Sequence, residues 1–125
     1  ESSKAIHAWL GINLDNATYN ESTQELTLEV VFDKKFQGRV DILSGAAIAA
    51  LLDLVCAIPA IIESNNNISV TGILKIKFLK PMIPGTKYIC KGKMGDNKKS
   101  TEGLITNPQG ENCASAEAVM VSIKK

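Results

Sequence analysis

Residues 44–63 read SGAAIAALLDLVCAIPAIIE, a run in which almost every side chain is Ala, Leu, Ile or Val. A helix that is apolar on all sides is typically buried. Ser44 is a good N-cap, and the small residues after it leave the N–H groups of the first turn open to a ligand or another backbone. Asp53 is a single carboxylate in the middle of this run. Because an isolated buried charge is costly, Asp53 is expected to have a partner or a function.

The length, charge and cysteine content are typical of one soluble domain. The chain has 125 residues, which suits a single domain spanning residues 1–125. Fourteen basic and 13 acidic side chains leave a formal charge of +1, which gives no electrostatic case for nucleic acid or an acidic membrane as a partner. Cys56, Cys90 and Cys113 are odd in number and lie among apolar residues. They are predicted to be reduced core thiols, with neither a disulfide nor a metal site.

The central run is about long enough to cross a membrane, but Asp53 and Pro59 argue against a membrane span. Pro59 is also expected to loosen the last turns of the helix, because its ring removes a backbone hydrogen bond. No positively charged signal-peptide start precedes an apolar run near Glu1. A soluble cytoplasmic protein with no membrane partner is therefore expected.

Alternation of apolar and polar residues predicts strands on both sides of the helix. Leu26, Leu28, Val30 and Phe32 recur at every second position. Such patterns and the turn signals between them predict strands at 11–19, 23–33, 68–80, 87–94, 100–106 and 112–123, a short helix at 3–9, a loop at 34–43 and a type I turn at 107–110. This order indicates an α+β fold, with a single antiparallel sheet wrapped around one long helix. A second copy is predicted to cover the apolar helix surface that the sheet leaves open.

The runs FQGRVDILSGAAIAALLD (36–53) and TGILKIKFLKP (71–81) resemble the hotdog-fold acyl-CoA thioesterases of the phenylacetate type. That family has a Gly-containing loop, then His-Gly-Gly, then a helix with Asp or Glu eight residues after the first of these glycines. A strand ending in a Phe-Leu-Arg-Pro-like sequence follows. Gly45 and Asp53 keep the interval, and FLKP at 78–81 matches the strand end. The chain departs from the pattern at Ser44, where the family has His, and at Ala46, where it has the second Gly.

The resemblance implies a hotdog fold and hydrolysis of an acyl-CoA or a related pantetheine thioester, without a cofactor. In this reading Asp53 is the base for water or a direct nucleophile, and the N–H of Gly45 stabilises the oxyanion. The remaining positions that it implies at the substrate are Ser44, Ala46, Gln37, Gly38 and Thr71. Thr71 lies where some members carry Ser or Thr near the attacking water. Gln37 or Gly38 falls where many members carry Asn or Gln.

Gly45 and Asp53 are too far apart on one helix to act on the same reacting centre. Eight residues of α-helix rise about 12 Å, whereas both groups need to reach within about 3 Å of the thioester. The resemblance implies that the helix N-terminus comes from one subunit and the carboxylate from its neighbour. The expected assembly is therefore a homodimer or a homotetramer made of two dimers.

Other functions stay open at this stage. Asp53 has a structural alternative, in which it only hydrogen-bonds hydroxyls or amides at the dimer interface. A non-catalytic acyl-CoA-binding or assembly hotdog domain is the second hypothesis, favoured by Ser44 and Ala46. A hydratase or dehydratase is third, because that chemistry usually needs a His partner that the loop lacks. His7, the only histidine, lies in the predicted N-terminal helix and is not expected to form a triad with Asp53.

Several lysines are candidates for contacting the phosphates of coenzyme A, since lysine ammonium groups suit that anion. Solvated sheet surface is the other interpretation of the same residues, and the sequence does not rank them. They are Lys75, Lys77, Lys80, Lys98 and Lys99.

Overall fold

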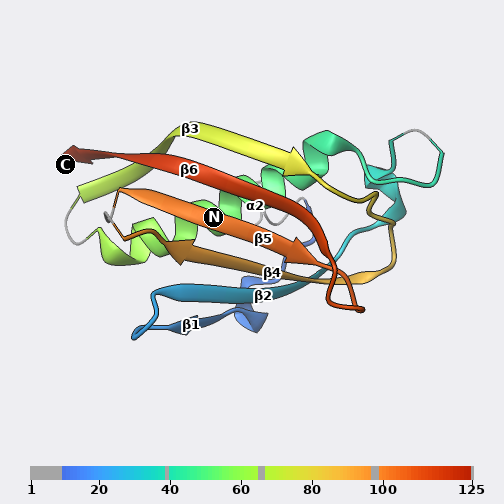
Figure 1. Cartoon of the computed structure of the whole chain (residues 1–125), viewed down its shortest axis with the longest axis horizontal. Coiled ribbons are helices and arrows are strands. Elements are labelled where there is room, and N and C mark those ends of the chain that lie inside the picture. Colours follow the sequence, from blue (N-terminus) through green and yellow to red (C-terminus); the bar gives the residue numbers. More distant parts are fainter. Residues whose placement is uncertain (1–9, 39, 65–66, 97–98, 125) are drawn as a thin grey trace.

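Figure 1 shows the computed structural model of the chain, which describes residues 10–38, 40–64, 67–96 and 99–124. One helix, α2 (Gly45–Glu63), lies along one face of a six-stranded antiparallel sheet with the strand order β1-β2-β4-β5-β6-β3. The strands are β1 (Thr18–Asn20), β2 (Glu25–Val31), β3 (Asn67–Phe78), β4 (Lys87–Met94), β5 (Ser100–Thr106) and β6 (Asn112–Lys124). The expected α+β architecture is confirmed. The helix expected at 3–9, with His7, lies outside the described residues.

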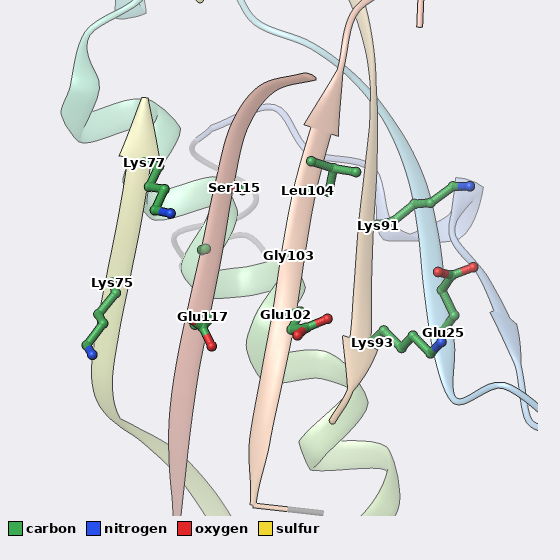
Figure 2. Close-up of a pocket in the computed structure, with 11 residues that line it drawn as sticks. Glu25, Lys75, Lys77, Lys91, Lys93, Glu102, Gly103, Leu104, Ser115 and Glu117 are labelled. Carbon is green, nitrogen blue, oxygen red and sulfur yellow. The ribbon is translucent and has the colours of Figure 1, made fainter. Parts of the chain in front are cut away.

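The sheet has one charged face and one apolar face. The face turned away from α2 carries cross-strand charged pairs, such as Lys75 of β3 opposite Glu117 of β6 (Figure 2). The face turned toward α2 carries the alternate residues, among them Leu26, Leu28 and Val30 of β2, each at most 3% exposed. This alternation is what a period of two residues produces in a sheet that is covered on one side.

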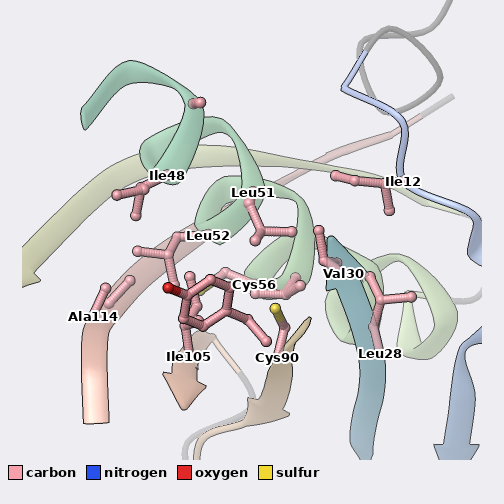
Figure 3. Packing of buried hydrophobic residues seen from close by; sticks show 14 of the residues in the cluster. Ile12, Leu28, Val30, Ile48, Leu51, Leu52, Cys56, Cys90, Ile105 and Ala114 are labelled. Atoms are coloured by element: carbon pink, nitrogen blue, oxygen red, sulfur yellow. The ribbon is translucent and has the colours of Figure 1, made fainter. Parts of the chain in front are cut away.

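The helix packs closely against the middle of the sheet. Leu51, Leu52 and Cys56 of α2 are fully buried among apolar side chains from β2, β4, β5 and β6 (Figure 3). By length and composition alone α2 is apolar enough to cross a membrane, with a mean hydropathy of 2.3. The core helix of a soluble domain meets the same criteria, and here α2 buries its residues against the sheet. The helix also continues through Pro59 to Glu63.

Two glycines allow this close approach. A Cβ atom at Gly92 of β4 would lie 1.8 Å from the carbonyl oxygen of Val55. A Cβ atom at Gly103 of β5 would meet side chains instead, at 3.0 Å from Cys56 Sγ and 3.3 Å from Val55 Cγ2. The backbone of α2 is therefore in contact with the backbone of β4.

The start of the chain differs from the prediction. A strand over 11–19 is wrong: Leu14–Asn16 form a 3-10 turn, and β1 is only three residues long. The Asn13 side chain accepts a hydrogen bond from the N–H of Asp15 at 3.0 Å and caps that turn. Such local side-chain bonds compete with strand formation. The predicted loop at 34–43 likewise contains a 3-10 turn, Lys34–Phe36.

Strand β3 is an edge strand. Among the described strands, it pairs with β6 alone. Leu74 and Ile76 pack against the core, but Phe78, predicted on the same apolar face, is 56% exposed. Phe78 lies on the expected face but is exposed in the single chain, because no described strand pairs with the outer edge of β3. A long edge strand with exposed apolar residues is prone to pair with another chain.

The two glycines beneath α2 should differ in their tolerance of a methyl group. Gly92→Ala is expected to lower the free energy of unfolding by about 2 kcal/mol or more, because backbone has to move to make room. Gly103→Ala should cost less, since only side chains have to shift. Urea unfolding followed by circular dichroism measures both. Equal losses for the two variants would contradict the proposed backbone contact.

Candidate active site

Asp53 lies on a part-buried face of α2 that points toward β3. The hydroxyl of Thr71 donates a hydrogen bond to Asp53 Oδ1 at 2.8 Å. Thr71 lies near the start of β3, the strand that follows α2 in the sequence. Its hydroxyl oxygen is 4.0 Å from the sulfur of Met120. Both residues are part-buried, and Thr71 is the partner that the sequence led us to expect for Asp53. The structure does bring Asp53 and Thr71 together, as a carboxylate held by a hydroxyl donor.

The N-terminus of α2 is the second feature of the site. The Ser44 side chain accepts a hydrogen bond from the N–H of Ala47 at 3.2 Å, which confirms its role as N-cap. The N–H groups of Gly45 and Ala46 have no hydrogen-bond partner among the described residues. Gly45 is exposed. A Cβ atom added at Gly45 would lie 3.7 Å from the ring of Phe78, the nearest side chain. Two free donors are therefore presented at the positive end of the helix dipole.

The loop before α2 folds back onto the helix cap. The N–H of Gly38 donates to the carbonyl of Ile42 at 2.7 Å, and a Cβ at Gly38 would lie 3.2 Å from Ser44 Cα. Gln37 pairs with Leu43 in an isolated bridge. Its side-chain Oε1 is buried and has no hydrogen-bond partner among the described residues. A buried unpaired acceptor is rare, and it marks a place where a ligand or an ordered water completes the structure.

Gln37 lines two cavities. One, of about 350 Å³, lies at the start of α2 and is lined by Leu10, Lys35, Phe36, Gln37, Ser44, Ala46, Ala47 and Ala50. The other, of about 520 Å³, is lined by Phe32, Asp33, Lys34, Gln37, Asp41, Ile83, Pro84 and Gly85. Sequence reasoning identified Gln37, Ser44 and Ala46 but missed the rest. The spacing of Ala46 and Ala50, one helical turn apart, was the available signal for the first cavity.

The two parts of the candidate site lie at opposite ends of β3. Gly45 is beside Phe78, at the end of the strand, whereas Asp53 is bonded to Thr71, near its start. Seven extended residues separate Thr71 from Phe78, which corresponds to roughly 20 Å. A single chain therefore does not bring the free N–H groups of α2 to the Asp53 carboxylate.

The lysines are distributed over several surfaces. Lys75 and Lys77 line a shallow pocket of about 410 Å³ on the face of the sheet turned away from α2, and hence away from Asp53 (Figure 2). Lys91 and Lys93 line the same pocket, together with three glutamates. Lys80 forms an ion pair with Glu111, with Nζ and Oε2 3.1 Å apart. Lys98 lies outside the described residues.

The cysteines are buried free thiols, as predicted. Burial raises the pKa of Cys56 to about 11, and the nearby Asp53 and Glu102 charges act in the same direction, against a hydrogen bond with Thr101 that lowers it. Burial raises the pKa of Cys90 to about 12. Because the thiolate is the nucleophile, neither group is activated at neutral pH. The described residues contain no cluster of three or more His, Cys, Asp or Glu side chains that would hold a metal.

Compared as a sequence, the chain matches no family model and no curated protein. Its structure is similar to that of the Escherichia coli PaaI protein from the phenylacetic acid degradation operon, with a TM-score of 0.80 and 17% identity over 98% of this chain and 86% of that one. It also resembles a putative thioesterase from Ralstonia eutropha JMP134, with a TM-score of 0.83 and 19% identity over 96% and 90% of the two chains.

A third similar structure is a Streptococcus mutans UA159 protein bound to acetyl CoA, with a TM-score of 0.75 and 19% identity over 88% and 89% of the two chains. At such identities the likeness establishes the fold. Sheet order, strand direction and the single long helix all agree with it. The chain therefore has the hotdog fold of these thioesterase-type structures.

Proposed function

We propose that this protein is a cytoplasmic acyl-CoA thioesterase, which hydrolyses the thioester bond of an acyl-CoA or related pantetheine thioester in a site shared by two subunits. The observation that carries the proposal is the Asp53 carboxylate, held by the Thr71 hydroxyl at 2.8 Å on a helix face that the single chain leaves part-exposed. The similar structures that are named as thioesterases or contain coenzyme A support the same reaction class.

In the proposed reaction Asp53 takes a proton from water, and the water oxygen adds to the thioester carbonyl carbon. The free N–H groups of Gly45 and Ala46 donate to the oxyanion that forms. Collapse of the tetrahedral intermediate breaks the C–S bond, and the leaving thiolate takes the proton back from the Asp53 carboxyl group, which restores the carboxylate. Asp53 attacking the carbonyl directly is the variant in which an anhydride forms first and water then hydrolyses it.

The substrate is proposed to lie along the loop before α2. Gln37 and Gly38 belong to that loop, Gln37 lines the cavity at the start of α2, and its amide is proposed to orient the substrate. Ser44 acts as the helix cap rather than as a nucleophile, because its oxygen accepts the Ala47 N–H and no histidine base adjoins it among the described residues. Thr71 is proposed as a positioning residue that orients Asp53.

Pairing of two β3 edges supplies the complete site. In an antiparallel pair of identical strands, a two-fold axis at Lys75 sets Phe78 of one chain opposite the partner's Thr71, because the β-bulge between Thr71 and Ile73 takes up one residue. Since Gly45 contacts Phe78 and Asp53 contacts Thr71, this register brings each helix N-terminus toward the partner's Asp53. The same contact would cover apolar side chains that are about half exposed in the single chain, such as Phe78 and Ile62.

A second exposed surface favours the assembly of two such dimers. Six aliphatic side chains, between 39% and 53% exposed, form three cross-strand pairs on the sheet face turned away from α2. They are Ile68, Val70, Ile73, Val119, Val121 and Ile123. Apolar patches of this kind mark interaction sites. The buried free thiols favour a reducing, cytoplasmic location.

The alternative is a hotdog domain that binds acyl-CoA without cleaving it. The observation that favours it is that the Ser44 hydroxyl already accepts a hydrogen bond from Ala47 as the helix cap. The family that the sequence resembles has a histidine at this position. Both functions would use the same cavity and the same helix N-terminus. A measurement of thioester hydrolysis therefore distinguishes them.

Replacing the carboxylate tests catalysis. Asp53→Asn is expected to lower kcat for acyl-CoA hydrolysis by about 10²–10⁴-fold, because the base is lost, while acyl-CoA still binds. Release of free CoA thiol measures the rate. Glu117→Gln, on the opposite face of the sheet, is the matched control and should keep full activity. Acyl-CoA binding without any hydrolysis by the unmodified protein would favour the non-catalytic alternative.

Thr71→Val tests the positioning role, because valine has the same shape as threonine and lacks the hydroxyl. The loss of one hydrogen bond to a charged group should lower kcat by about tenfold with little change in KM. Thr71→Ser keeps the hydroxyl and should restore most of the rate. If Thr71→Ser is slower than Thr71→Val, the rate depends on the volume of the side chain rather than on the hydroxyl. That result would rule out the positioning role.

Mixing two inactive variants tests the shared site. Gly45→Pro removes one N–H while keeping the helix, because proline suits the first helical position and Ser44 already has the extended conformation that it requires (φ −66°, ψ 145°). Refolded together with Asp53→Asn, it should recover roughly a quarter of wild-type activity. Half of the dimers are then mixed, and each mixed dimer has one intact site. Each variant refolded alone is the control, and a mixture no more active than these would contradict a site between subunits.

A further inference from the structure

The cavity at the start of α2 has walls that suit an apolar group. Five of its eight lining residues are Leu10, Phe36, Ala46, Ala47 and Ala50. Lys35 also lines it, and its ammonium lies over the ring of Phe36, 5.1 Å from the ring centroid. At about 350 Å³, the cavity is within the size range of small-molecule sites.

This cavity adjoins the proposed oxyanion contact. Ala46 lines the cavity, and its N–H is one of the two free donors at the helix start. A thioester whose carbonyl oxygen accepts from that N–H therefore has its acyl chain next to the apolar walls. Three of those walls are alanine side chains of α2, which leave space that a larger residue would fill.

We infer that this cavity holds the acyl group, that the substrates carry short, uncharged acyl groups, and that Ala50 sets the limit on their size. The inference rests on the proposed function, because it places the acyl group from the carbonyl position. A terminal carboxylate on the acyl group would lose its hydration against the apolar walls, and the cationic side chain among the eight lining residues, Lys35, is exposed and lies over the Phe36 ring.

Ala50 is the lining position at which a larger side chain would occupy the cavity without entering the core. It is part-buried, whereas Leu51 and Leu52 beside it are fully buried under the sheet. Ala57 offers a matched control. It lies seven residues further along α2, about two turns, on the same face, is also part-buried, and does not line the cavity.

The experiment measures kcat/KM for acetyl-, hexanoyl- and succinyl-CoA with the wild type, Ala50→Leu and Ala57→Leu. The wild type should prefer hexanoyl- to succinyl-CoA. Ala50→Leu should lose about tenfold or more on hexanoyl-CoA and stay within about threefold on acetyl-CoA, because only the longer chain reaches position 50. Ala57→Leu should leave the ratio unchanged. An unchanged hexanoyl-to-acetyl ratio in Ala50→Leu, or a preference for succinyl-CoA, would overturn the inference.

Binding separates this inference from the proposed reaction. Calorimetric titration of hexanoyl-CoA and of free CoA should show tighter binding of hexanoyl-CoA to the wild type, and Ala50→Leu should remove most of that difference. Such binding without hydrolysis would overturn the thioesterase proposal and support the cavity assignment. Hydrolysis with equal affinities for both ligands would overturn the cavity assignment alone. Ala50→Val, a smaller change, replaces Ala50→Leu if thermal unfolding shows that the leucine variant is not folded.

Discussion

The contact between the backbone of α2 and the backbone of β4 is the constraint on which the rest of the structure depends. At Gly92 there is no room for even one methyl group between the strand and the carbonyl of Val55. Side chains cannot relieve such a contact by choosing another rotamer, so it fixes the height of the helix over the sheet. It also fixes where the two ends of the helix lie. Gly45 is held next to Phe78, and Asp53 next to Thr71, because the middle of α2 has no freedom to shift.

The order of the strands explains why the positions of Gly45 and Asp53 matter for the proposed function. Strand β3 follows the helix in sequence but pairs only with β6, at the edge of the sheet. Both halves of the candidate site therefore lie along a single unpaired edge, and the groups that are separated in one chain become neighbours when two edges pair. Edge strands of this length are usually protected by charges or proline, whereas β3 keeps Phe78 and Ile73 exposed. The proposed pairing of two β3 edges would cover Phe78 and complete the divided site.

The candidate site combines two neutral hydrogen-bond donors with one carboxylate. The helix start offers two N–H donors, and the serine in the place of the family's histidine is used for capping the helix. In the proposed reaction, a carboxylate with a hydroxyl donor supplies the base. The unpaired Oε1 of Gln37 and the alanine-lined cavity lie on the same side of the helix start, which gives the site one polar contact and one apolar wall.

The sequence by itself determined the features that arise from local patterns. The apolar run after Ser44 predicted α2, and alternation predicted five of the six strands closely. The resemblance to a thioesterase family, rather than a local pattern, pointed to Gly45, Asp53 and Thr71 as candidate site residues. Where a local hydrogen bond competed with the pattern, as at Asn13, the prediction of a long first strand failed. Only the tertiary structure decided that Phe78 is exposed, that the Gln37 Oε1 atom is buried without a hydrogen-bond partner among the described residues, and that Ala50 faces a cavity. Those properties depend on which residues from distant parts of the chain come into contact, and periodicity along one segment carries no information about the partner segment.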